Sequence, residues 1–422
     1  MISEMKQRIF VHDTEPLSLY IHIPFCVQKC RYCDFLSFPA GETQRQQYVE
    51  ALVRQILAGP PSFCTEKKES GADPVRPGNP GHGTDTKPGG PGRLVDTIFL
   101  GGGTPSLLTA AQLENILTAI RRIYRLLPDA EITMECNPGT VSLGRLREFR
   151  ELGINRLSLG VQSFQDEELK LLGRIHTAAE AEEAFYLAVE AGFEQINLDL
   201  MSALPGQSLA EHEANLRKAA ELGPEHLSVY SLILEEGTRL YDMARQKLIP
   251  DLPGEELDRE MYHRTGELLS AYGYKQYEIS NYAKKGSCCR HNIGYWTGHE
   301  YYGIGLGASS LIAGRRFREE AKLGAYLEKY AAISEPEGSA FEDLQVLTPE
   351  DRMSEFMFLG LRLCEGVSET EFETRFGEKL QVVYGTEIQR HLRNGLLIRE
   401  GDRLRLSAKG MDLANYVMSD FV

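Results

Sequence analysis

Short apolar runs of the β type alternate along the chain with amphipathic segments of helical period. The runs predict strands over 17–23, 95–100, 131–135, 156–160, 195–200 and 226–233. Strands that alternate with helices are typical of βα units built around a parallel sheet. Six such units predict an α/β fold, a partial (β/α)6 barrel that stops short of the closed eightfold form.

The segments between these runs begin with clear helix-start patterns. Capping boxes occur at Thr109 with Gln112, Thr177 with Glu180 and Ser208 with Glu211. Side chains with chemical potential follow the strands at or near their carboxyl ends, namely Cys26, Gly101, Glu135, Gln162 and Asp199. Because chemistry on such sheets lies at the carboxyl ends of the strands, we expect one site at this rim.

Residues 59–92 interrupt the pattern with seven of the nineteen prolines and eight of the forty glycines. The stretch has almost no aliphatic side chains, so it predicts a disordered insertion between the first helix and the second strand. Cys64 lies inside it. We therefore expect Cys64 to be a free surface thiol that takes no part in a metal site.

The last eighty or so residues have a different character. Helical patterns over 349–363, 368–376 and 381–394 precede a hairpin over 396–406 and a final helix from about Ala408. Three helices with a two-stranded wing predict a winged-helix-like domain at 341–422, after a barrel domain at 1–340. Such a module either binds DNA or packs against the barrel. The net charge of −15 favours packing and predicts no nucleic-acid partner.

Three cysteines, Cys26, Cys30 and Cys33, follow the first predicted strand directly. Three close thiolates suit a [4Fe-4S] cluster, whose usual complement is four cysteine ligands, and would leave one iron open. A zinc site would need a fourth ligand at a recognisable spacing, and the nearest histidine, His22, lies upstream. Three neighbouring cysteines cannot all form disulfides with one another. The motif therefore predicts an iron–sulfur cluster with an open coordination position.

The composition places this cluster in a reducing compartment. The other five cysteines are scattered, at 64, 136, 288, 289 and 364, which is no disulfide framework. No apolar run approaches the roughly 18 residues of a membrane span, and the first residues form no signal peptide. We expect a cytoplasmic protein, with peripheral membrane association left open.

The cysteine loop, with Tyr32 before its last cysteine, and the turn Gly101-Gly-Gly-Thr-Pro105 resemble the radical S-adenosylmethionine (SAM) superfamily. Further strings narrow the resemblance: Glu135-Cys-Asn-Pro138, Gly160-Val-Gln-Ser163, Leu172-Gly-Arg-Ile-His176, Asn197-Leu-Asp199 and Leu204-Pro-Gly-Gln207. Together they resemble the oxygen-independent coproporphyrinogen III dehydrogenase family over nearly the whole chain. The resemblance implies that the open iron is chelated by SAM.

It also implies a SAM pocket made of Tyr20, Tyr32, Gly102, Gly103, Thr104, Glu135, Gln162, Arg174 and Asp199. A zwitterion, a sulfonium and a ribose diol require an arginine, carboxylates and backbone polar groups together. Singly, each residue has a structural interpretation, such as a strand-end cap for Asp199. Jointly, and in this order, they favour the pocket. One departure is Met201-Ser-Ala203, which replaces an expected aromatic–glycine pair.

Two absences divide this family. Dehydrogenase members carry a further cysteine two residues after the third ligand, where this chain has Cys33-Asp-Phe35, and they have a longer N-terminal extension. The chain is instead similar to the sister branch of haem chaperones, HemW. The sequence His291-Asn-Ile-Gly-Tyr-Trp296 matches the HNxxYW signature of that branch and marks 288–310 as a candidate haem-binding segment.

Histidine is a common axial ligand of haem iron, so His291 is the haem candidate, with Cys289 as a competing ligand. Its structural alternative is a hydrogen-bonded loop residue. The resemblance implies a carrier of haem to acceptor haemoproteins, with membrane-bound acceptors left open. Two alternatives keep the radical chemistry: decarboxylation of coproporphyrinogen III, or a reaction on haem itself. Either would need a reductant such as flavodoxin or ferredoxin.

Overall fold

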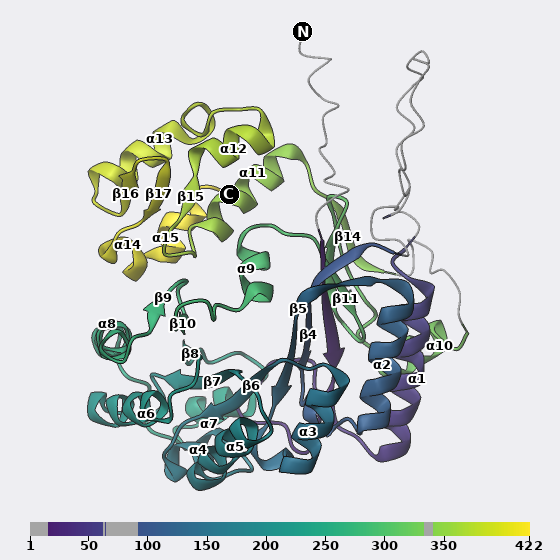
Figure 1. The fold of residues 1–422 in the computed structure, drawn as a ribbon. Coiled ribbons are helices and arrows are strands. Elements are labelled where there is room, and N and C mark those ends of the chain that lie inside the picture. The colour runs from purple at the N-terminus through teal and green to yellow at the C-terminus, as the bar shows by residue number, and fades with distance from the viewer. Residues whose placement is uncertain (1–15, 62–63, 65–91, 333–340) are drawn as a thin grey trace, which may run out of the picture.

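The computed structural model describes residues 16–61, 64, 92–332 and 341–422. Its centre is a curved sheet in which six parallel strands are neighbours in chain order (Figure 1). These strands are β1 (Leu17–Ile23), β4 (Leu94–Gly102), β5 (Arg125–Cys136), β6 (Arg156–Gln162), β7 (Gln195–Ser202) and β8 (His226–Ser231). All six were predicted from the sequence, and the partial (β/α)6 barrel is confirmed.

Helices cover the outer face of this sheet, namely α1 (Glu42–Ala58), α2 (Ala110–Ile123), α3 (Leu143–Leu152), α5 (Ala178–Glu190), α6 (Leu209–Leu222) and α8 (Glu255–Ala271). Two short helices, α4 (Asp166–Leu172) and α7 (Arg239–Arg245), lie instead beside the cysteine loop and bond to the backbone of Arg31. The three predicted capping boxes form at the starts of α2, α5 and α6, with both reciprocal hydrogen bonds in each. The satisfied N–H groups fix where these helices begin.

The sheet extends beyond the six strands at both edges. Beside β1 lies the parallel strand β11 (Tyr301–Ile304), followed by the antiparallel strands β12 (Ser309–Ile312), β13 (Arg315–Arg318) and β14 (Glu342–Val346). Beside β8 lie β10 (Asn281–Ala283) and β9 (Lys275–Gln276). The sequence pattern did not predict these strands, because they have two to five residues and pair with segments far away in the chain.

Cys64 is not the surface thiol that the insertion predicted. It is 1% exposed and packs in the barrel's hydrophobic core, and this burial raises the pKa of its thiol to about 12. The local composition misled the prediction because one residue of a polar stretch lies against the barrel. Apart from residues 59–61, 64 and 92, the predicted insertion lies outside the described residues.

The C-terminal residues form a second core. Helices α11 (Pro349–Gly360), α12 (Glu369–Phe376), α13 (Leu380–Arg393), α14 (Ala408–Asp412) and α15 (Ala414–Ser419) surround a small sheet. The predicted hairpin forms as β16 (Leu397–Glu400) and β17 (Arg403–Leu406). It is joined by β15 (Val367–Ser368), so the wing has three strands and not two. The predicted final helix breaks at Leu413 into two.

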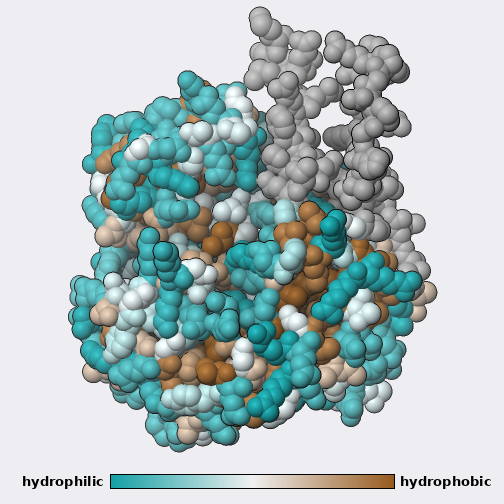
Figure 2. Space-filling view, viewed as in Figure 1, coloured by the Kyte–Doolittle hydropathy of each residue, from teal (hydrophilic) through white to brown (hydrophobic). Residues whose placement is uncertain are grey.

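This module packs on the barrel through α9 (Arg290–Trp296). The Arg362 guanidinium lies 4.2 Å from the centre of the Trp296 ring and 3.5 Å from Glu278 Oε2. Arg375 Nη1 donates to the Thr297 carbonyl oxygen at 3.0 Å. Figure 2 shows mostly hydrophilic residues over the module in this view. The contacts agree with the packing role that the acidic composition favoured.

Candidate functional site

The three predicted cluster ligands lie on one loop at the carboxyl end of β1. Cys26 ends the short strand β2 (Phe25–Cys26), which pairs with β3 (Phe38–Pro39). All three thiols are free and partly buried. Each sulfur lies near a polar side chain: Thr104 Oγ1 at 3.6 Å from Cys26 Sγ, Arg174 Nη1 at 3.3 Å from Cys30 Sγ, and Ser37 Oγ at 3.8 Å from Cys33 Sγ.

The glycine turn at the end of β4, residues 101–105, is hydrogen-bonded to the backbone that leads into the cysteine loop. The N–H of Gly103 donates to the Ile23 carbonyl oxygen at 2.8 Å, and the N–H of Thr104 to that of Phe25 at 2.7 Å. A Cβ on Gly103 would lie 2.7 Å from the Phe25 oxygen, and Gly102 has φ +108°. Only glycine allows this close approach and this backbone conformation. The turn therefore fixes the position of Cys26 with two N–H groups that are not free to bind a ligand.

A cavity of about 350 Å³ opens beside the cysteines. It is lined by the three thiols and by the predicted residues Tyr32, Gly102, Gly103, Thr104, Glu135, Gln162, Arg174 and Asp199. Residues from β4, β5, β6 and β7 thus meet at one rim, as expected from the carboxyl ends of parallel strands. Tyr20 lies outside this lining, and its hydroxyl is 3.0 Å from His22 Nδ1.

The cavity joins the carboxyl groups of Glu135 and Asp199 to the Arg174 guanidinium, all three from partly buried residues. Glu135 Oε2 accepts from the Gly102 N–H at 2.9 Å, while Asp199 accepts from Ser158 Oγ at 2.9 Å. Burial, with repulsion from Asp199, raises the pKa of Glu135 to about 8. Burial also raises the pKa of Asp199. Arg174 Nη2 donates to the Gly160 carbonyl oxygen at 2.5 Å. A cationic ligand would stabilise the ionised carboxylates.

The donor set fits an iron–sulfur cluster with an open position. Three thiols from one loop border the cavity, and Arg174 Nη1 lies 3.3 Å from Cys30 Sγ. In the described part of the chain, no three His, Cys, Asp or Glu side chains lie close enough together to hold a single metal ion. A cubane instead spreads its thiolate ligands over several irons.

Met201 and Ala203 lie at the position where the sequence departs from the family's aromatic–glycine pair. Met201 lines the same cavity, so the position of the expected aromatic pair still borders the site. Ala203 has φ +56°, a conformation that favours glycine. The backbone turn is therefore kept with alanine in the left-handed region, at a strain of about 1 kcal/mol.

The haem candidate His291 is inside the barrel. It is 1% exposed, and its Nδ1 lies 2.8 Å from Thr97 Oγ1 and its Nε2 3.0 Å from Tyr295 Oη. Burial lowers the pKa of His291 to about 3, so the ring is neutral. The alternative ligand Cys289 is also buried, with its Sγ 3.5 Å from Glu131 Oε1. Neither side chain lines the cysteine cavity.

His291 and Tyr20 instead line a second, inner cavity of about 180 Å³. It shares Glu135, Ser158, Asp199 and Tyr230 with the cysteine cavity, so the two adjoin. The polar residues Arg156, Ser158, Asn197 and Ser228, which also line this cavity, were not predicted from the sequence. The pattern that could have found them is alternation, because inward-facing polar residues occur at every second position of β6, β7 and β8.

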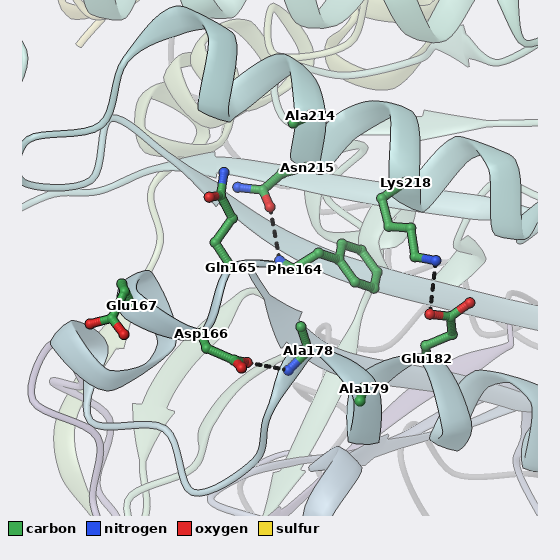
Figure 3. A pocket seen from close by; sticks show the side chains of 10 residues that line it. All are labelled: Phe164, Gln165, Asp166, Glu167, Ala178, Ala179, Glu182, Ala214, Asn215 and Lys218. Atoms are coloured by element: carbon green, nitrogen blue, oxygen red, sulfur yellow. Dashed lines mark hydrogen bonds and ion pairs between the residues drawn. The ribbon is translucent and has the colours of Figure 1, made fainter.

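A third hollow, of about 510 Å³, lies on the outer surface between α5 and α6 (Figure 3). Its polar groups bond mainly to one another. Asn215 Oδ1 accepts from the Phe164 N–H at 2.8 Å, and Lys218 Nζ lies 2.8 Å from Glu182 Oε2. Paired groups of this kind stabilise the helix contacts and offer little to a ligand.

The described residues contain no helix that is both long and apolar enough to cross a membrane. The fold is similar to that of coproporphyrinogen III oxidase (HemN) from Escherichia coli, a radical SAM enzyme. The TM-score is 0.78 at 23% identity, and the match covers 100% of this chain and 92% of that one. This likeness concerns the fold.

Curated relatives are similar over nearly the full length. Heme chaperone HemW of Lactococcus lactis subsp. lactis is 36% identical over 97% of this chain and 98% of its own. The HemW proteins of Bacillus subtilis and Escherichia coli are 35% and 36% identical over 96% of this chain, and over 99% and 98% of theirs. The Radical SAM superfamily model matches residues 90–219, and the HemN C-terminal domain model matches 347–413. The chain belongs to the HemW family within the radical SAM superfamily.

Proposed function

We propose that this protein is a haem chaperone, which binds haem and delivers it to acceptor haemoproteins. The observation that carries the proposal is the similarity, over at least 96% of the chain, to relatives named heme chaperone HemW. Its partners would be haem and acceptor haemoproteins, including membrane-bound ones.

The scaffold of the proposed chaperone holds a [4Fe-4S] cluster and SAM. Cys26, Cys30 and Cys33 would bind the cluster, which when loaded supplies an iron with an open position and one-electron chemistry. The cavity residues would hold SAM, with Arg174 near the carboxylate end and ionised Glu135 near a positive group. The polar lining supports this assignment because burial of so many polar groups is stable only when they have partners.

Haem ligation by His291 requires a local rearrangement. Both ring nitrogens already have a partner, so one of the contacts to Thr97 or Tyr295 must break before the imidazole can bind iron. Ligation by Cys289 would similarly release its contact to Glu131. Because α9 is a short helix at the contact between barrel and module, its displacement would couple haem binding to the position of the C-terminal module.

The experiment is a haem titration of the anaerobically reconstituted protein, followed by absorbance. We expect saturable binding near one haem per chain in the wild type, and lost or spectrally altered binding in His291→Ala. The matched control is His212→Ala. His212 is also a buried histidine, but it bonds Thr265 between α6 and α8 and lines neither cavity. Binding that is unaffected by His291→Ala but altered by Cys289→Ala would keep the function and move the ligand.

Absence of saturable haem binding would refute the chaperone and favour the alternative, oxidative decarboxylation of coproporphyrinogen III. That activity is tested by porphyrin analysis after anaerobic incubation with SAM and a reductant. We expect no appreciable vinyl product, because Phe35 stands where the dehydrogenase branch has a cysteine.

A further inference from the structure

Arg156, the first residue of β6, is a buried cation that lacks a direct partner. It is 4% exposed, and its guanidinium makes no hydrogen bond or ion pair with any residue that the structure describes. Two other arginines differ: the buried Arg93 bonds Glu300 at 2.7 Å, and the partly buried Arg174 bonds the Gly160 carbonyl oxygen. Burial lowers the pKa of Arg156, but Cys289, Glu131 and Asp199 are near enough to raise it above its usual value. None of them accepts a hydrogen bond from the guanidinium. Buried N–H groups without an acceptor are unfavourable, so those of Arg156 indicate an acceptor group in the cavity.

Arg156 borders the inner cavity, and so does the Asn292 amide. Within the described ranges, the Asn292 side chain likewise has no hydrogen-bond partner. The neighbouring carboxylates are engaged elsewhere: Glu131 accepts from the N–H groups of Arg290 and His291, and Asp199 accepts from Ser158. The cavity therefore brings together a guanidinium and an amide whose hydrogen-bonding groups are unused.

We propose that this inner cavity binds a carboxylate group, with the Arg156 guanidinium and the Asn292 amide as its partners. A planar carboxylate matches the fork of a guanidinium, which can donate two parallel hydrogen bonds. The cavity has a volume of about 180 Å³, whereas sites for drug-sized ligands have roughly 300–1,000 Å³. A whole porphyrin therefore does not fit inside it.

The carboxylate has two possible sources. One is a short free carboxylate. The other is a carboxylate arm of a larger ligand whose body lies in the adjoining cysteine cavity or displaces α9, as a haem propionate would. The second source rests on the proposed haem function, and the first does not.

The test titrates sodium propionate into the protein without haem or SAM, followed by calorimetry and by thermal stability. We expect saturable binding in the wild type and affinity at least about tenfold lower in Arg156→Met, the loss expected for a charge-assisted hydrogen-bonded pair. Arg93→Met is the matched control: it removes a buried arginine that has a partner, and it leaves propionate affinity unchanged.

The unfolding temperature with and without propionate gives a second readout. Propionate should raise the unfolding temperature of the wild type and of Arg93→Met, but not that of Arg156→Met. Equal propionate affinity in wild type and Arg156→Met, absence of saturable propionate binding together with unchanged haem affinity, or an equal rise of the unfolding temperature in wild type and Arg156→Met would overturn the proposal.

Haem and its dimethyl ester distinguish the sources. If Arg156→Met weakens haem binding but not ester binding, the carboxylate is a propionate of the porphyrin. If the variant loses propionate ion but binds haem normally, the ligand is a free short carboxylate. Failure of the wild type to bind haem at all refutes the chaperone function and leaves the propionate titration as an independent test of the site.

Discussion

Glu135 makes SAM binding depend on pH. Its carboxyl group is buried beside Asp199, and burial, with that repulsion, raises its pKa to about 8. Tyr20 and Tyr295 also face it, and neither is charged in this range because burial raises both of their pKa values. Glu135 is therefore largely protonated at pH 6. A cationic ligand such as SAM favours the ionised carboxylate, so its binding should release a proton below pH 8.

The size of the effect follows from the pKa. If the carboxylate is ionised in the complex, the need to ionise it first multiplies the dissociation constant of SAM by a factor of 1 + 10^(pKa − pH). With a pKa of about 8 this factor is about 100 at pH 6 and about 2 at pH 8, so binding is roughly fiftyfold weaker at pH 6. Without ligand the sign for stability is the opposite. The folded chain keeps the proton that the unfolded chain loses near pH 4.5, so the free energy of unfolding falls as the pH rises from 4.5 to about 8.

The assay is calorimetric titration of SAM into the reconstituted protein at pH 6, 7 and 8, in buffers of different ionisation enthalpy. Glu135→Gln removes the titrating group, so its affinity should change much less with pH and its proton release should fall by about one. Glu211→Gln is the control, because hydrogen bonds from Ser208 keep the pKa of Glu211 low. The same pH slope in wild type and Glu135→Gln would refute the reasoning.

Three further predictions test the cluster loop and the contact between barrel and module. Cys30→Ser, which removes one of three thiolates, should abolish the iron and sulfide content of the reconstituted protein while the circular dichroism of the fold stays unchanged. Gly103→Ala should lower the free energy of unfolding by about 1–3 kcal/mol and reduce iron content, because its new Cβ meets the Phe25 carbonyl oxygen; wild-type iron content would contradict this. Trp296→Leu should weaken packing of the module by roughly 1–2 kcal/mol, and a double-mutant cycle with Arg362→Met should assign most of that loss to the pair. Additive effects in the cycle would count against the contact.

The sequence predicted the parts of the fold that depend on local patterns. The six barrel strands and three capping boxes are encoded by apolar runs and by residues three positions apart, and each appears where it was expected. The cluster cysteines and most of the predicted SAM residues share one cavity, because strand ends in a parallel sheet meet at one rim.

What the sequence could not predict depends on distant contacts. The strands β11 to β14 are short and become strands only by pairing with β1 and with each other. The burial of Cys64 and the lack of hydrogen bonds to the Arg156 guanidinium depend on which distant residues the fold places beside them. The sequence left His291 as either a haem ligand or a hydrogen-bonded loop residue; it is hydrogen-bonded to Thr97 and Tyr295, but it lies on a helix and lines the inner cavity.

The pairing of β1 between β4 and β11 has a consequence for synthesis on the ribosome. Leu19 and Tyr20 pair on one side with residues of β4 and on the other with Tyr302 and Gly303. The strand that carries the cysteine loop therefore keeps an open edge until about three-quarters of the chain has left the exit tunnel. An unpaired edge is a site of aggregation. We conclude that the nascent chain passes through a long vulnerable stage, in which its cysteines are translated early but the sheet around them is completed late.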